Sequence, residues 1–352
     1  MRMTMTMTTT ATTMTIATTT SAALSRSLWL AAAATVAVLC AAGANAQSLV
    51  DELAWAYAIT PGTDPAAPVD DGTQRSLPGT DKTFKLDQIR NRQGPADWFP
   101  GDHPSMPPVV ANGREAAGIW ACSLCHYPNG KGRPENAGVS GLPKEYFAQQ
   151  LYDMKHGLRM SADTRKPNTP RMIAFAAAMT DEEIQQAAEY FGAIKWTPWI
   201  DVVEAKMVPK TAPRGGMHLR LEGAEGGMEP IGKRIIETPR NTEYTEVLRN
   251  PHSDFIAYVP VGAVAKGKAL ATTGGGKTTQ CTVCHGDSLN GLAVVPSLRG
   301  RSPSYIARQL ADFKQGTRHG PWAPLMVQVV AKLSADDILN LSAYLASLPP
   351  EH

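Results

Sequence analysis

The strongest pattern of apolar and polar positions occurs in two segments that each begin with a hydroxyl residue. Thr180 and Ser334 precede acidic residues, after which apolar residues recur three or four positions apart. Side chains at this spacing share one face of an α-helix, so both segments are predicted to be amphipathic helices. Their apolar positions are Ile184, Ala187, Ala188 and Phe191 in the first segment, and Ile338, Leu341 and Leu345 in the second.

Both predicted helices also carry a start signal. A Ser or Thr side chain at the N-cap accepts a hydrogen bond from a backbone N–H of the first turn. An acidic residue three positions later bonds back to the N–H of the N-cap itself. Glu183 stands at this distance from Thr180, and Asp337 stands at it from Ser334. We therefore predict that the helices begin next to these two N-caps.

The two helices end two copies of a longer repeat. Residues 122–159 align without a gap to residues 281–318, and a further helix is predicted in each copy, at 144–156 and 302–315. A period this long indicates duplicated domains and not a solenoid. The aligned identities include Gly132/Gly291, Tyr146/Tyr305, Gln150/Gln309, Asp153/Asp312 and Arg159/Arg318.

A separate apolar run lies near the beginning of the chain. Residues 28–42 are apolar, a basic residue precedes them, and Ala44-Asn45-Ala46 follows. This order is typical of a secretory signal peptide, so residues 1–46 are predicted to be cleaved and the rest exported to the periplasm. The alternative is an uncleaved membrane anchor. Cys40 follows Leu39, where a lipoprotein signal has a small residue, and is predicted to be lost with the signal.

Composition and charge exclude some classes of partner. The hydrophobic fraction of 43% is sufficient for buried cores, whereas aromatic residues make up only 7%. The formal net charge is +2, and no basic stripe is present that would bind nucleic acid. The 30 glycines and 27 prolines indicate long irregular connections between the helices.

The remaining cysteines lie in two CxxCH motifs at the start of the repeat. Cys122 and Cys125 are followed by His126, and the second copy has the same arrangement. CxxCH is the attachment sequence of c-type haem, in which both thiols bind the haem covalently and the histidine binds the iron. Two disulfides, or one zinc site shared by all four cysteines, are alternatives that leave the histidines unexplained. The second motif comprises Cys281, Cys284 and His285.

A matching methionine precedes the last helix of each copy. Pro170-Arg171-Met172 and Pro324-Leu325-Met326 are each predicted to lie in a loop. Met172 and Met326 are predicted to be the distal iron ligands, since Met opposite His is common in electron-transfer haems. The alternative is that they are ordinary core methionines. Rival ligands are Met154, Met160 and Met179 in the first copy and His319 in the second.

Further residues are predicted to support the haems. A carbonyl near Pro296 is in range of the ring N–H of His285, a contact that fixes the imidazole of a metal ligand. Ala137 stands at the matching position of the first copy, which leaves that contact open there. Arg159 and Arg318 either pair with haem propionates or are solvated loop residues.

These motifs resemble the dihaem cytochrome c4 family. The resemblance rests on the paired CxxCH and Pro-x-Met segments and covers roughly residues 109–196 and 262–352. It implies a mainly α fold with two tandem class I cytochrome c domains, two covalently bound haem c groups and His/Met ligation of both irons. It also implies a protein that carries electrons between membrane complexes and other partners.

The chain departs from this family in two segments. Residues 47–108 form a Pro-rich N-terminal extension, and residues 197–261 form an insert between the domains. The insert contains β-prone runs at 233–237 and 255–261, which predict one or two short hairpins packed on the haem domains. His103, His218 and His252 lie in these two segments and are predicted to be loop histidines, not ligands.

The expected function is therefore electron transfer without catalytic residues. The expected donors are a quinol-oxidising complex or a periplasmic dehydrogenase, and the expected acceptor is a membrane oxidase. Peripheral association with the membrane is also expected. One alternative is the cytochrome subunit of a periplasmic dehydrogenase, and another is a dihaem peroxidase-like enzyme, which would need one iron without a distal protein ligand.

Overall fold

The computed structural model describes residues 49–62 and 68–351. The predicted signal peptide, residues 1–46 with Cys40, lies outside the described residues. Within the described ranges, no helix has both the length and the apolar stretch that crossing a membrane requires.

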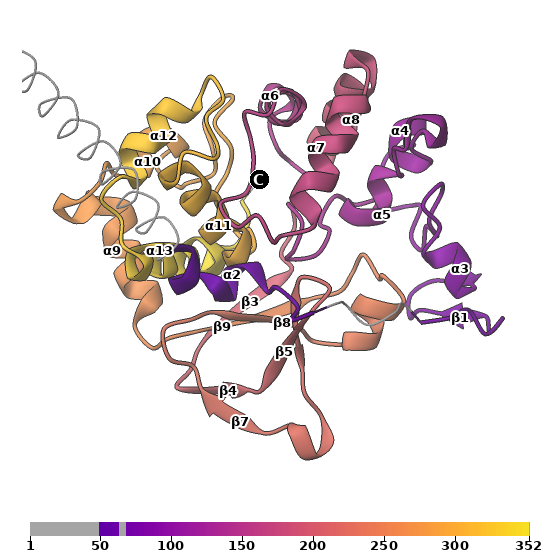
Figure 1. Cartoon of the computed structure of the whole chain (residues 1–352), viewed down its shortest axis with the longest axis horizontal. Coiled ribbons are helices and arrows are strands. Elements are labelled where there is room, and N and C mark those ends of the chain that lie inside the picture. Colours follow the sequence, from indigo (N-terminus) through magenta and orange to yellow (C-terminus); the bar gives the residue numbers. More distant parts are fainter. Residues whose placement is uncertain (1–48, 63–67, 352) are drawn as a thin grey trace, which may run out of the picture. The chain divides into compact units, whose positions relative to one another are not determined.

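Two helical regions have the same order of elements (Figure 1). The first helical region contains α4 (Pro108–Ala111), η1 (Glu115–Ala117), α5 (Cys122–His126), α6 (Lys144–Lys155), α7 (Asn168–Ala178) and α8 (Asp181–Ala193). The second helical region contains α9 (Ala263–Thr273), η4 (Gly274–Gly276), α10 (Thr282–His285), α11 (Pro303–Lys314), α12 (Ala323–Val330) and α13 (Ala335–Ser347). The helices predicted at 144–156 and 302–315 are confirmed as α6 and α11.

The predicted capping boxes are confirmed at both terminal helices. The Thr180 hydroxyl accepts from the backbone N–H of Glu183, whose carboxylate accepts from the N–H of Thr180. Ser334 and Asp337 make the same pair of bonds at α13. All the apolar positions predicted for these helices are buried. The local pattern therefore determined where both helices begin and which face they bury.

The prediction of a loop around each Pro-x-Met segment is wrong. The first methionine lies in α7 and the second in α12. Proline usually interrupts a helix, but these two prolines are compatible with one. Pro170 and Pro324 stand in the first turn, where no N–H is needed for an intrahelical bond.

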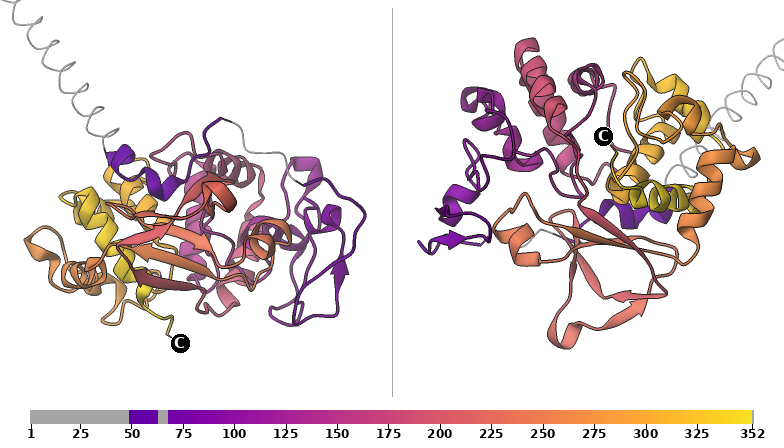
Figure 2. Two further views of the ribbon diagram at one scale, coloured as in Figure 1. Left: turned by 90° about the horizontal axis from the view of Figure 1, so that it is seen from below. Right: turned by 180° about the vertical axis from the view of Figure 1, so that it is seen from behind.

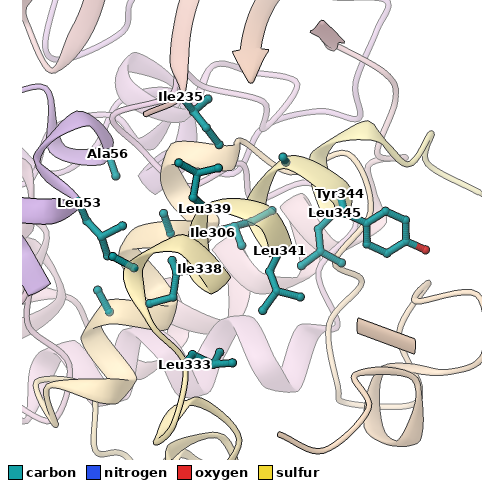
Figure 3. Packing of buried hydrophobic residues seen from close by; sticks show 14 of the residues in the cluster. Leu53, Ala56, Ile235, Ile306, Leu333, Ile338, Leu339, Leu341, Tyr344 and Leu345 are labelled. Atoms are coloured by element: carbon teal, nitrogen blue, oxygen red, sulfur yellow. The ribbon is translucent and has the colours of Figure 1, made fainter. Parts of the chain in front are cut away.

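The core of the second helical region includes residues from the beginning of the described chain. Leu49, Leu53 and Tyr57, in and beside α2 (Ala54–Tyr57), are buried together with residues of α9, α11 and α13. Figure 3 shows side chains from these elements, including Ile306 and Ile338, gathered in one cluster. The core of the first helical region is built from its own helices, including α4.

The insert forms strands on one side of both helical regions (Figures 1 and 2). The strands are β3 (Ile200–Glu204), β4 (Met207–Pro209), β5 (Thr211–Arg214), β6 (Met217–Arg220), β7 (Met228–Pro230), β8 (Ile236–Pro239) and β9 (Phe255–Val259), with η2 (Gly223–Glu225) and η3 (Glu243–Val247) between them. The predicted β-prone runs at 233–237 and 255–261 overlap β8 and β9. Strands β5 and β6 form a hairpin outside these runs, and β4 pairs antiparallel with β7. The insert is richer in sheet than predicted, since β9 also pairs in parallel with β3 and antiparallel with β8.

The N-terminal extension has its own small cluster. It contains β1 (Arg75–Ser76), which pairs antiparallel with β2 (Thr83–Phe84), and α3 (Leu86–Ile89). Trp98 is buried there, and its indole N–H donates to the carbonyl oxygen of Leu248 in the insert at 2.9 Å. The two segments in which the chain departs from the family resemblance therefore pack against each other.

Candidate functional site

The second CxxCH motif lines a large apolar cavity. The cavity has a volume of about 400 Å³, and Cys281, Cys284, His285 and Met326 all line it. Met326 is the only methionine among the lining residues, all of which belong to the described chain. Most of the other lining side chains are apolar, and they include Leu298, Ile306, Leu310, Phe313, Val329, Leu333, Leu341 and Leu345.

Of the first CxxCH motif, His126 lines a smaller cavity, whereas Cys122 and Cys125 are not among its lining residues. His126 and Met172 face the same space of about 120 Å³. The rival residues Met154 and Met160 also line it, so position alone does not choose among the three methionines. The other rival, Met179, is buried in the core and is not part of this lining.

Both motif histidines are oriented in the same way. Nδ1 of His285 lies 2.8 Å from the carbonyl oxygen of Pro296, which confirms the predicted contact. Nδ1 of His126 lies 2.9 Å from the carbonyl oxygen of Ala137. The contact that the sequence left open in the first copy is therefore present. Burial lowers the pKa of both imidazoles, which favours the neutral form. With Nδ1–H donating to a carbonyl, the neutral ring keeps its Nε2 lone pair available for a metal.

The four motif cysteines are free thiols. Burial raises the pKa of Cys122 to about 12 and that of Cys281 to about 11, so these thiols are protonated at neutral pH. The described residues contain no group of three or more His, Cys, Asp or Glu side chains arranged to hold a metal ion.

Arg159 and Arg318 are buried, so the alternative that they are solvated loop residues is wrong. Arg159 donates to the phenol oxygen of Tyr305 at 3.2 Å and to Gln309 at 2.9 Å, both in the second helical region. Arg318 donates to Tyr146 at 2.7 Å and Gln150 at 2.6 Å in the first. The two arginines also pair through an isolated antiparallel bridge. Each copy therefore holds the aligned Tyr and Gln of the other copy.

Further buried charged residues near the cavities were not predicted from the sequence. Lys166, Arg308 and Asp312 line the first cavity, although Arg308 and Asp312 come from the second copy. Arg301 lines the second cavity and donates to the carbonyl oxygens of Gly138 and Ser140 in the first helical region. Only Asp312 had a sequence signal, since it is identical in both copies.

The remaining histidines do not line either cavity. His319 is exposed, which favours its interpretation as a surface residue over that as a rival ligand. His103 bonds to Asp97, and His252 bonds to Asp102, both within the loops where they were predicted. His218 differs from the prediction, because it lies on β6, is buried and bonds to the carbonyl oxygen of Trp55 at 2.8 Å.

Comparison with known proteins identifies relatives across most of the chain. The Cytochrome c family model matches residues 110–195. Cytochrome c4 of Pseudomonas aeruginosa is 40% identical over 247 residues, which cover 68% of this chain and 88% of the relative. The thiosulfate dehydrogenase electron acceptor of Stutzerimonas stutzeri is 26% identical over 68% of this chain and 84% of its own length. The crystal structure of reduced cytochrome c4 from Pseudomonas stutzeri aligns over 64% of this chain and 93% of its own, with 22% identity and a TM-score of 0.42.

Proposed function

We propose a function from one premise, which is that the chain belongs to the cytochrome c4 family. The chain is accordingly a c-type cytochrome that carries covalently bound haem c and takes part in electron transport. The finer proposal is a carrier with two haems, one in each of two tandem class I cytochrome c domains, at residues 109–196 and 262–352. The N-terminal extension, residues 47–108, and the insert, residues 197–261, are additions to these domains.

One observation carries this proposal. A single apolar cavity is lined by two thiols, a histidine and a methionine, at Cys281, Cys284, His285 and Met326. This donor set fits a c-type haem, which needs two thiols for covalent attachment and a ligand on either side of the iron. An apolar lining of this extent favours a largely apolar ligand over a hydrophilic one.

The first copy is assigned by its alignment to the second. Cys122 and Cys125 would attach the first haem, and His126 and Met172 would bind its iron. The matching hydrogen bonds of both histidines support the same role in both copies. Met172 is preferred over Met154 and Met160 because it aligns with Met326 relative to the last helix.

The protein residues act by holding the haems and not by bond chemistry. When bound, each haem supplies an iron that changes between Fe(III) and Fe(II). The carbonyl oxygens of Ala137 and Pro296 hold the ring N–H groups of the histidines and so fix each imidazole. The thioethers of Met172 and Met326 would bind the iron of the haem in their own copy, which would raise its reduction potential and exclude small ligands. No catalytic residue is assigned.

The proposed location and partners follow from the same family. The protein would act in the periplasm after cleavage of residues 1–46, and it would exchange electrons with a quinol-oxidising complex or dehydrogenase and a terminal oxidase. A second candidate is the cytochrome subunit of a periplasmic dehydrogenase. This alternative is favoured by a relative whose name describes it as the electron acceptor of thiosulfate dehydrogenase.

The visible absorption spectrum of the reduced, exported protein, with and without carbon monoxide, tests the proposal. We expect two haems per chain and no spectral change with carbon monoxide, because both irons have a methionine ligand. A carbon monoxide adduct at one haem would mean that one iron lacks its distal ligand. The proposal of a simple carrier would then be wrong, and the dihaem enzyme would replace it.

A further inference from the structure

The two CxxCH helices are covered to very different extents. Leu124 is the residue before the second cysteine of the first motif, and only 7% of its side chain is exposed. Val283 is the aligned residue of the second motif, and it is 64% exposed. The same element of the repeat is therefore buried in one copy and faces solvent in the other.

Helix α4 and the N-terminal extension cover one side of the first motif. Helix α4 packs against α5, and Sγ of Cys122 lies 3.4 Å from the carbonyl oxygen of Val109. The backbone N–H of Ala121 donates to the carbonyl oxygen of Arg92 at 2.8 Å. These contacts place the first cysteine of the motif against protein, and it is partly accessible.

Residues 243–251 of the insert, which we term the covering segment, lie on the other side. Arg249 donates to the carbonyl oxygen of Leu124. Asn129 donates to the carbonyl oxygen of Pro251 at 2.8 Å, and Arg133 forms an ion pair with Glu246 at 2.7 Å. Arg249 adopts a φ of 50°, a conformation that side chains other than glycine rarely adopt. The segment therefore accepts backbone strain at the residue that reaches the motif.

The second copy has no counterpart of these contacts in the described chain. Ser288 aligns with Asn129 and is exposed, and Leu292 aligns with Arg133 and is 59% exposed. Cys284 is likewise exposed, whereas Cys125 is only partly accessible. The same order of helices occurs in both copies, but these contacts of the covering segment are made only with the first copy.

We propose that the covering segment closes the edge of the first CxxCH motif to other molecules, and that electrons enter and leave the protein at the second motif, beside Val283 and Cys284. The first haem then exchanges electrons with its surroundings through the second. This inference rests on the proposed function, because it requires a haem at each motif. A count of haems per chain would expose a failure of that function before any rate is measured.

Charge substitutions test the exchange site through the rate of oxidation by hexacyanoferrate(III), a trivalent anion, in stopped-flow experiments. At an ionic strength of about 0.1 M, Val283→Glu should slow oxidation of the reduced protein about threefold, and Val283→Lys should speed it about threefold. Both substitutions are on the surface, so folding should be unaffected. Opposite effects from the two charges would exclude a general disturbance of the domain.

Control variants change the charge elsewhere, by two units at Glu243 and by one unit at Val69. Glu243→Lys alters the exposed start of the covering segment, and Val69→Glu repeats the valine substitution in the N-terminal extension, where the side chain is 87% exposed. Neither control should change the rate by more than about a fifth, since neither charge lies at the exchange site. If Glu243→Lys changed the rate as strongly as the Val283 variants, the first edge would be open and the proposal would be wrong.

A second readout does not depend on electron transfer. A neutral gadolinium chelate added to the reduced protein should relax the thioether-methyl proton signals of the haem at Cys281 and Cys284 more than those of the haem at Cys122 and Cys125. Arg249→Gly, which removes the bond to Leu124 and relieves the left-handed backbone, should increase relaxation at the first haem. Equal relaxation of both haems in the unaltered protein would refute the closed first edge.

Discussion

The ligand positions show how neighbouring backbone groups prepare individual side chains. Each motif histidine is held by one carbonyl oxygen that lies eleven residues further along the chain, at Ala137 and at Pro296. Proline and alanine serve equally because the contact uses only the backbone. The methionines are less constrained, since three of them line the first cavity whereas Met326 stands alone in the second.

Met326→Ala should therefore give the clearest ligand phenotype. Without the thioether, the second iron would lose its sixth ligand, so we expect carbon monoxide to bind one haem and the reduction potential of that haem to fall. A redox titration followed by absorbance measures both effects. Val327→Ala, the neighbouring residue in α12, is the matched control and should behave like the unaltered protein. An unchanged M326A spectrum would remove Met326 from the ligand set.

At the scale of single elements, the capping boxes are the strongest local signals. Thr180 with Glu183 and Ser334 with Asp337 bond reciprocally, as the sequence predicts. The sequence could predict these caps because both partners lie within one helical turn. It could not assign the Pro-x-Met segments, because proline is compatible both with the first turn of a helix and with a loop.

Ser334→Ala should lower the free energy of unfolding by about 1 kcal/mol, the usual cost of losing an N-cap. The hydroxyl accepts from Asp337, and the alanine methyl group cannot. Guanidinium denaturation followed by far-ultraviolet circular dichroism would measure the change. Ser334→Thr keeps the hydroxyl and should recover most of the loss. A loss as large in the threonine variant would assign the effect to packing and not to the cap.

A second element-scale prediction concerns Glu237 on β8. This carboxylate is 1% exposed and accepts bonds from the Ser302 hydroxyl at 2.7 Å and from the Ser304 N–H. Burial raises its pKa in the folded state, so folding favours the protonated form. Stability from this group is complete below about pH 4, the range of an unfolded glutamate, and is lost as pH rises through the raised folded value.

Glu237→Gln should flatten that part of the curve of unfolding free energy against pH. The amide cannot ionise and still presents an oxygen to Ser302. Urea denaturation at several pH values between 4 and 8 would measure the curve, with Glu225→Gln as an exposed control. If the Glu237→Gln variant and the unaltered protein gave curves of the same shape, Glu237 would not titrate in this interval.

For the whole molecule, the arginine network is the connection that local patterns could not reveal. The sequence predicted that Arg159 and Arg318 are equivalent, because the repeat aligns them. It could not predict that each would bind the other copy, because that depends on how the copies meet. The same holds for α2 and His218, whose partners lie far along the chain and have no local signature.

A double-mutant cycle should detect this reciprocal arrangement. Arg159→Ala and Arg318→Ala should each cost about 2 kcal/mol, since each leaves one Tyr hydroxyl without its charged partner. The double variant should cost more than the sum by about 1 kcal/mol, because either arginine alone still donates to both Gln150 and Gln309. Equilibrium unfolding measures the cycle, with Lys266→Ala as the exposed control. Strict additivity would mean that the two halves of the network act independently.

The placement of α2 has a consequence for the order in which the chain can fold. Leu53 and Tyr57 are synthesised among the first of the described residues, but their core partners in α11 and α13 are among the last. The second core therefore has an element with a very long sequence separation, which slows its completion. The first helical region has its own core and can form while synthesis continues. Helix α2 must therefore wait for its core partners until nearly the whole polypeptide is available.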